Sequence, residues 1–307
     1  MSLLSYTPVI ATFERPGDLR RLLESLAAQE RKPAQVIIID SSRDERTKEM
    51  VGAMNNGLDL CYERAEIPSA AEQRNQGVRL VKTPLVAFMD DDVTLYPDSC
   101  EKLCRVFEFD KEERTGGVVA RMTGADRPVP RGLLWWYYRI QAGFDHPTYG
   151  GKLFGPAINC FPSYSEPQSE DLIPADWLHS GCVFYRTNVF LKERFPCFPG
   201  YSFMEDVHLS ARVGKTHRLY FHTSARFDHH DSTSSWKRDF KGIAQKRVRN
   251  QRLVAEEILG LKGGELEWKL LLHRLFVTIY LLRQRGPGFW QEIAGTWSAS
   301  YTPHENS

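Results

Sequence analysis

Hydrophobic residues near the start of the chain follow two alternating patterns. Continuous apolar runs occur in "YTPVIAT" (6–12), "AQVIIID" (34–40) and "LVAFM" (85–89), and runs of this length predict buried strands. Apolar residues recur every three or four positions in "GDLRRLLESLAAQ" (17–29), which predicts a helix. Further elements are expected as a helix over 43–54, a strand over 58–64 and a helix over 69–81. This alternation predicts βαβ units, and therefore an α/β fold with a Rossmann-like, mostly parallel sheet flanked by helices.

The pattern is less regular in the middle of the chain. The segments "GGVVARMTG" (116–124) and "GCVFYRTNVF" (181–190) predict two more strands, whereas "LLWWYYRIQAGF" (133–144) predicts an aromatic helix or loop. A long loop is expected over "NCFPSYSEPQSE" (159–170), and acceptor specificity is placed in this region because long loops often shape substrate pockets. From 236 to 300 the composition shifts to helix formers, which predicts a helical C-terminal extension.

Three polar clusters directly follow predicted strands: Thr12 to Arg15, Asp40 to Arg43, and Asp90 to Asp92. The carboxyl ends of parallel strands lie at one edge of a sheet, and ligands bind at that edge. Each cluster alone is also typical of a polar turn. Together the three favour one shared site.

Asp90, Asp91 and Asp92 place three like charges side by side. In a partly desolvated site such carboxylates raise one another's pKa unless a cation neutralises them. Mg²⁺ and Mn²⁺ take carboxylate oxygens and commonly bind together with substrate phosphates. A metal site is therefore one interpretation. The alternative is a polar turn that caps the helix expected after Pro97, and the run by itself leaves both open.

A second acidic pair and a histidine pair lie much later in the chain. Glu205 and Asp206 in "FMEDVHLSARV" precede a helical apolar rhythm, so a catalytic role competes with simple stabilisation of a helix N-terminus. His229 and His230 end an alternating strand, and neutral imidazole is a good ligand for Mn²⁺. Adjacent residues on a strand point to opposite faces, so at most one of the two histidines is expected to be a ligand.

The bulk composition excludes several classes of protein. The 307 residues are 42% hydrophobic, which is enough for a large core, and the net charge of +1 provides no overall field for nucleic acid. The six cysteines contain no CxxC pair, so neither a zinc site nor a disulfide framework is expected. The segment "MSLLSYTP" lacks a basic start followed by a long apolar stretch, so no secretion signal is predicted and the cytoplasm is the expected location.

The longest apolar segment near the C-terminus is "LLLHRLFVTIYLL" (270–282). His273 and Arg274 interrupt it, and it is shorter than the roughly 20 residues of a membrane span, so a packed helix is predicted. Trp268 and Arg283 are among the residues that flank it in the manner of surface-lying helices. Peripheral contact of the C-terminal helices with the inner face of a membrane therefore stays open.

Five sequence blocks together resemble the family 2 glycosyltransferases, which have the GT-A fold. The resemblance runs from about Tyr6 to Ser235, and the order and approximate spacing of the blocks agree. Glu72 and Gln73 stand where the family usually has small residues, and are mild departures. The blocks are "PVIATFERPGDLRRLLESL", "VIIIDSS", "AAEQRNQGVRLVKTPLVAFMDDDV", "SGCVFYR" and "EDVHLSARV".

The resemblance assigns roles to individual residues. It implies that Asp206 is the general base, beside Glu205, and that Asp92 is the direct ligand of Mg²⁺ or Mn²⁺. Asp90 and His229 would complete the metal site. The residues expected to bind the nucleotide-sugar donor are Thr12, Glu14, Arg15, Asp40, Arg74, Asp90 and Asp91, of which Thr12, Asp40 and Arg74 would hold the nucleobase.

The same resemblance implies a division of the chain and an activity. Residues 1–235 would form the GT-A domain, with a nucleotide-binding half (1–115) and an acceptor-binding half (116–235), and 236–307 the helical extension. The expected reaction moves a sugar from a UDP-sugar to a hydroxyl of a saccharide, glycolipid or cell-surface polysaccharide. A cation would stabilise the leaving diphosphate, and a single in-line base implies inversion at the anomeric carbon.

Two other interpretations are weighed against this one. A sugar-phosphate nucleotidyltransferase would normally have a glycine-rich phosphate loop after the first strand, but "TFERPGD" contains one glycine. A non-catalytic sugar-nucleotide-binding module would be favoured by eroded acidic clusters, and these are intact. The basic stretch "WKRDFKGIAQKRVRNQR" (236–252) is expected either to close over the diphosphate or to form a solvated helix face.

Overall fold

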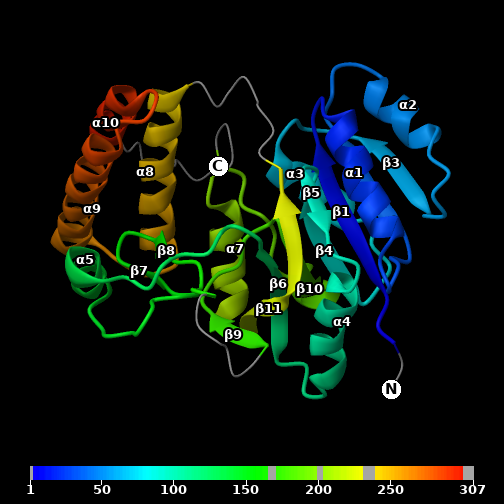
Figure 1. The fold of residues 1–307 in the computed structure, drawn as a ribbon, viewed down its shortest axis with the longest axis horizontal. Coiled ribbons are helices and arrows are strands. Elements are labelled where there is room, and N and C mark those ends of the chain that lie inside the picture. Colours follow the sequence, from blue (N-terminus) through cyan, green and yellow to red (C-terminus); the bar gives the residue numbers. More distant parts are fainter. Residues whose placement is uncertain (1–2, 165–170, 199–202, 231–238, 300–307) are drawn as a thin grey trace. The chain divides into compact units, whose positions relative to one another are not determined.

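The computed structural model describes residues 3–164, 171–198, 203–230 and 239–299 (Figure 1). The chain divides into two compact units. The sheet unit comprises 1–129, 148–152 and 160–231, and the helical unit comprises 130–147, 153–159 and 232–307. Residues 130–147 and 153–159 therefore pack with the C-terminal helices, although the sequence places them within the first domain.

The sheet unit is built on one large mixed sheet in the order β3-β2-β1-β4-β10-β6-β11-β5, with β9 paired to β11. Parallel pairing joins β3, β2, β1 and β4, and also joins β6 to β11, whereas β10 is antiparallel to both of its neighbours. This is the predicted α/β architecture. The strands are β1 (Tyr6–Thr12), β2 (Val36–Asp40), β3 (Leu60–Arg64), β4 (Leu85–Asp90), β5 (Val93–Leu95), β6 (Thr115–Met122), β9 (Leu172–Ala175), β10 (Cys182–Arg186) and β11 (Arg218–His229).

Helices cover both faces of this sheet (Figure 1). Ile10 and Ile38 share a buried cluster with Leu22 of α1 and Leu103 of α4, so α1 and α4 cover one face. Gly77 of α3 lies against the neighbouring strand residues, including Ile39, whose side chains point to the opposite face. The helices of this unit are α1 (Pro16–Ala27), α2 (Arg46–Gly52), α3 (Ala70–Val78), α4 (Ser99–Phe109), α6 (Thr187–Phe190) and α7 (Glu205–Gly214).

The structure corrects one predicted boundary and adds one strand. The strand expected over 181–190 ends at Arg186, which pairs with the first residue of β4, and the chain then turns into α6. The short strand β5 follows Asp92 and was not predicted, because three residues are too few to show a periodicity. Asp90 thus ends β4, and Asp91 and Asp92 form the turn into β5. They do not cap α4, whose N-cap is Asp98.

The helical unit contains α5 (Gly132–Ala142), α8 (Phe240–Glu257), α9 (Gly263–Gln284), α10 (Phe289–Ser298) and the hairpin of β7 (Leu153–Phe154) with β8 (Ile158–Asn159). The aromatic segment is a helix, and Tyr137 stacks on Phe276 of α9 with ring centroids 4.0 Å apart. The Tyr137 hydroxyl lies 2.6 Å from Nδ1 of His273. Among the described residues, no helix is long and apolar enough to cross a membrane.

The close packing of α3 on the sheet gives a first testable prediction. A methyl group built on Gly77 would overlap Cγ1 of Val9 and lie 3.2 Å from Cγ1 of Ile39, whereas one on Gly52 of α2 meets nothing within 4 Å. We expect Gly77→Ala to lower the free energy of unfolding by about 1–2 kcal/mol, because overpacking outweighs the helix propensity of alanine. Gly52→Ala is the control and should raise the free energy of unfolding slightly. Urea denaturation distinguishes the two, and equal behaviour of both variants would contradict the packing.

Candidate active site

The three polar clusters meet at one edge of the sheet because the strands that carry them are neighbours. Thr12 at the end of β1 pairs with Asp40 at the end of β2, and Ala11 pairs with Asp90 at the end of β4. The carboxyl ends of three adjacent parallel strands therefore deliver Thr12, Asp40 and Asp90 side by side. This is the edge at which α/β sheets bind ligands.

Arg15 neutralises part of the charge of the acidic run, and Thr12 donates a hydrogen bond to it. Asp91 accepts a hydrogen bond of 2.7 Å from the Thr12 hydroxyl, and Nη1 of Arg15 lies 3.1 Å from a carboxylate oxygen of both Asp91 and Asp92. Asp91 is only 6% exposed, and this burial raises the pKa of its carboxyl to about 7 although Arg15 acts in the opposite direction. One guanidinium shared by two carboxylates explains how adjacent like charges are accommodated.

Arg74 joins the two acidic clusters. Its Nη2 lies 2.7 Å from Oδ1 of Asp90, and its Nη1 lies 3.2 Å from Oε1 of Glu205. The guanidinium also donates to the Ser180 hydroxyl at 3.2 Å and lies over the ring of Phe195, 5.3 Å from the centroid. Arg74 is only 4% exposed, and it connects α3 with the end of β4 and the start of α7.

Asp40 has a different set of partners. Its carboxylate accepts from the backbone amide of Ser42 at 2.8 Å and from the Tyr62 hydroxyl at 2.7 Å, and Nη1 of Arg64 lies 3.4 Å away. The Ser42 hydroxyl oxygen also accepts a hydrogen bond of 2.7 Å from the backbone amide of Glu14. This bond holds the loop after β1 beside the end of β2. Asp40 and Arg74, which the resemblance groups around one nucleobase, thus lie in separate hydrogen-bonding networks of the described chain.

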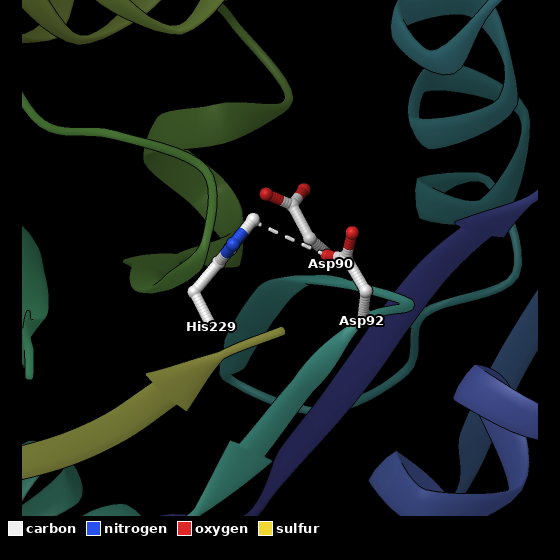
Figure 2. Close-up of side chains that lie close together, drawn as sticks. All are labelled: Asp90, Asp92 and His229. Atoms are coloured by element: carbon white, nitrogen blue, oxygen red, sulfur yellow. Dashed lines mark ion pairs between the residues drawn. The ribbon is translucent and has the colours of Figure 1, made fainter. Parts of the chain in front are cut away.

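Asp90, Asp92 and His229 converge on one point (Figure 2). One ligand atom from each lies within 4.8 Å of the others, and Nε2 of His229 is 3.3 Å from Oδ1 of Asp92. Two carboxylate oxygens and one imidazole nitrogen suit Mn²⁺, and also Mg²⁺ if water or substrate phosphate completes the shell. The donor set therefore fits the predicted metal.

The pairing of β11 with β5 selects His229 over its neighbour. Ala225 and Phe227 are fully buried, and His229 continues the same face of the strand. His230 is exposed on the other side, where its Nε2 lies 2.8 Å from the Thr94 hydroxyl. Its backbone amide donates to the carbonyl of Asp92 at 2.8 Å, which fixes the register between the two ligand-bearing segments.

Asp206 lies at the start of α7, and within the described residues its carboxylate accepts hydrogen bonds from two backbone amides. Oδ2 accepts from Ser180 at 3.3 Å, and Oδ1 accepts from Val207 at 2.7 Å. Burial, reinforced by the charge of Glu205, raises the pKa of Asp206 to about 7, and burial raises the pKa of Glu205 in the same direction. The N-cap of α7 is Met204, which makes no side-chain cap, so capping alone does not account for the acidic pair.

Two residues just before β10 were missed by sequence reasoning. Ser180 donates to Asp90 at 3.4 Å and offers its amide to Asp206, so it joins both acidic clusters. His179 is buried beside them, and burial lowers its pKa to about 4. Ser180 opens one of the five quoted sequence blocks, which is the signal that could have found it; His179 and Tyr62 carry no such signal.

Comparison with known proteins is consistent with this geometry. A family model described as "Glycosyl transferase family 2" matches residues 7–165. An uncharacterized glycosyltransferase from Haemophilus influenzae is 34% identical over 101 residues, a match that spans 33% of this chain and 33% of that protein.

Several solved structures share the fold. Residues 1–349 of TarS from S. aureus in complex with UDP-GlcNAc give a TM-score of 0.52 at 17% identity, covering 93% of this chain and 75% of that chain. A longer TarS structure is covered over 43% of its length, with a TM-score of 0.51 at 16% identity over 90% of this chain. GalNAc-T7 with UDP, GalNAc and Mn²⁺ gives 0.55 at 16% identity, covering 88% of this chain and 56% of that chain. Identities this low show the shared fold alone.

The geometry of the histidine pair makes a second prediction. His229→Ala should weaken Mn²⁺ binding by about tenfold or more, because it removes the nitrogen donor from the cluster. His230→Ala is the matched control and should bind almost as tightly as the wild type, since its ring faces Thr94. Isothermal titration calorimetry with Mn²⁺ measures both. The reverse order of affinities would mean that β11 presents the other face to the site.

Proposed function

The chain belongs to the glycosyl transferase family 2, and on this basis we propose that it moves a sugar from a nucleoside diphosphate to an acceptor hydroxyl with inversion. The observation that carries the proposal is the convergence of Asp90, Asp92 and His229 at the sheet edge, next to the network that leads to Asp206. A UDP-sugar is the proposed donor, in preference to guanosine or thymidine donors. Fold relatives whose structures hold UDP-GlcNAc, or UDP with Mn²⁺, support this choice.

In this proposal the first half of the sheet unit binds the donor. Arg15 and the hydroxyl of Thr12 provide donors at the edge where the diphosphate would lie, and Asp40 offers a buried acceptor beside the aromatic ring of Tyr62. Residues 1–115 would thus contact the nucleotide, and residues 116–235 the acceptor. A saccharide or a glycolipid is the proposed acceptor class.

Asp90, Asp92 and His229 are the residues that would hold Mn²⁺ or Mg²⁺. A bound divalent ion supplies positive charge that stabilises the diphosphate as it leaves. Arg15, which already lies 3.1 Å from Asp92, adds a fixed positive charge to the same edge. The chain itself therefore orients the leaving group with a guanidinium next to the carboxylates.

Asp206 is the proposed general base. As the acceptor oxygen forms a bond to the anomeric carbon, the bond to the diphosphate breaks with its electron pair, and the hydroxyl proton passes to the Asp206 carboxylate. The raised pKa of Asp206, about 7, makes this carboxylate a stronger proton acceptor than an ordinary aspartate. Glu205 is bound to Arg74 and instead contributes by raising the pKa of its neighbour.

Removal of one metal ligand tests the donor site. In Asp92→Asn the part of UDP affinity that depends on Mn²⁺ should disappear, because an amide cannot supply the anionic ligand. Affinity measured without metal should change little. Asp59→Asn, which removes an exposed carboxylate on the same unit, is the control and should bind as the wild type does. Calorimetry with UDP in the presence and absence of Mn²⁺ gives both values, and unchanged metal-dependent affinity in Asp92→Asn would exclude Asp92 as a ligand.

Replacement of the proposed base tests the chemistry. Asp206→Asn should retain UDP and Mn²⁺ binding and lose transfer by about 10²–10⁴-fold, the usual worth of a positioned base. In the wild type, kcat/KM should fall as the pH drops below about 7, because protonated Asp206 cannot accept a proton. The residual activity of the variant should lack this inflection. If Asp206→Asn moved sugar at a near wild-type rate with an unchanged pH profile, Asp206 would not be the base, and Glu205 would be the next candidate.

A further inference from the structure

The helical unit contains a cavity that the proposed transfer reaction does not use. It has a volume of about 230 Å³ and lies between α8 and α9, next to Ala299 after α10. Val248 and Leu270 form apolar parts of its lining. The remaining lining is charged: Arg249 and Arg252 come from α8, and Glu267 and Arg274 come from α9. Three guanidinium groups thus converge on one cavity with one carboxylate among them.

The three arginines are unequally neutralised. Arg252 has two carboxylate partners, Glu256 at 3.1 Å from its Nε and Glu267 in contact with its Nη2. Arg249 and Arg274 have no ion pair within the described part of the chain, and the Nε atom of each is buried with no hydrogen-bond partner there. Burial lowers the pKa of Arg274; the charge of Glu267 opposes this effect and the charge of Arg252 adds to it. A buried N–H donor without an acceptor is unfavourable, and an arriving anion would relieve it.

The shape and charge of the cavity indicate which anion it accepts. Glu267 is held by Arg252, so the two unpaired guanidiniums of Arg249 and Arg274 leave a net positive charge. The planar guanidinium fork matches a tetrahedral phosphate with two parallel hydrogen bonds. From this geometry we infer that the cavity between α8 and α9 binds a phosphate group through Arg249 and Arg274, and that the phosphate is carried by a lipid.

The adjoining surface of α9 supplies the argument for a lipid. Large apolar side chains recur along this helix at intervals of three or four residues, and they are exposed to between 40% and 58%. Residues at such intervals form one stripe along a helix. Its first three members each follow a cavity-lining residue, Glu267, Leu270 or Arg274, by one position, so the stripe lies about 100° around α9 from the cavity lining. A ligand with an anionic group for the cavity and an apolar part for the exposed stripe of the same helix is an amphiphile. The stripe consists of Trp268, Leu271, Leu275, Ile279 and Leu282.

The experiment measures binding and does not depend on transfer activity. The full chain is sedimented with phosphatidylcholine vesicles that contain phosphatidic acid, and with vesicles of phosphatidylcholine alone. Arg249→Gln and Arg274→Gln should each weaken binding to the phosphatidic acid vesicles by about tenfold or more, because each removes a charge-assisted hydrogen bond. Arg274→Lys, which keeps the charge but loses the fork, should also weaken it. Arg283→Gln removes an exposed charge from the same helix and is the matched control, expected to bind as the wild type does.

Each outcome decides one part of the inference. Equal weakening by Arg249→Gln, Arg274→Gln and Arg283→Gln would overturn it, because the attraction would then be diffuse. Melting temperatures of all variants are measured alongside and identify any variant that fails to fold. Arg249→Gln and Arg274→Gln test the cavity independently, because they change different helices. If inorganic phosphate raises the melting temperature of the wild type but not of Arg249→Gln, while vesicles do not bind, the phosphate pocket is supported and its lipid source is overturned.

Discussion

The structure of the site depends on one buried cation. Arg74 reaches from α3 to Asp90 on one side and to Glu205 on the other, a residue 131 positions away in the sequence. Taking a guanidinium out of water is unfavourable unless it is paired and hydrogen-bonded, and removing either partner would leave an uncompensated buried charge. The ion pair of Arg74 with Glu205 holds the start of α7, and therefore Asp206, at the site. The acidic clusters are close because they share a counter-ion.

In the described part of the chain, the arginines of the site make direct ion pairs with the other carboxylates of the two acidic clusters but not with Asp206. Arg15 serves Asp91 and Asp92, and Arg74 serves Asp90 and Glu205. Among the described residues Asp206 has no direct ion pair and is held by two backbone amides. Burial raises the pKa of Asp206, and it also raises the pKa of Asp91 and of Glu205 although these two have arginine partners. Asp206 differs from these two in the lack of a counter-ion in direct contact within the described residues, which leaves its carboxylate available to accept a proton.

Much of this arrangement was predictable from local pattern. Apolar runs identified β1, β2 and β4, so the polar residues after them had to share an edge, and the alternation of Ala225 and Phe227 selected His229. The partners of Arg74 were not predictable from the sequence. The acceptors within reach of a long side chain are set by tertiary packing, which local pattern does not show. The packing of α5 on α9 was missed for the same reason. Its aromatic residues bury against a helix more than a hundred positions later, as in the Tyr137–Phe276 stack.

The ladder between β11 and β5 has a consequence for selectivity. Asp92 precedes β5 directly, its carbonyl accepts from His230, and His229 pairs with Val93, so two of the three converging side chains stand on one hydrogen-bonded frame. Because this backbone pairing forms during folding, the conformational entropy is lost before any ion binds. The spacing between the two ligand side chains then has little freedom to increase. Ca²⁺ requires longer bonds and more oxygen ligands than Mg²⁺ or Mn²⁺. The sheet edge would therefore discriminate between cations by ionic radius, because backbone pairing fixes the distance between the ligands.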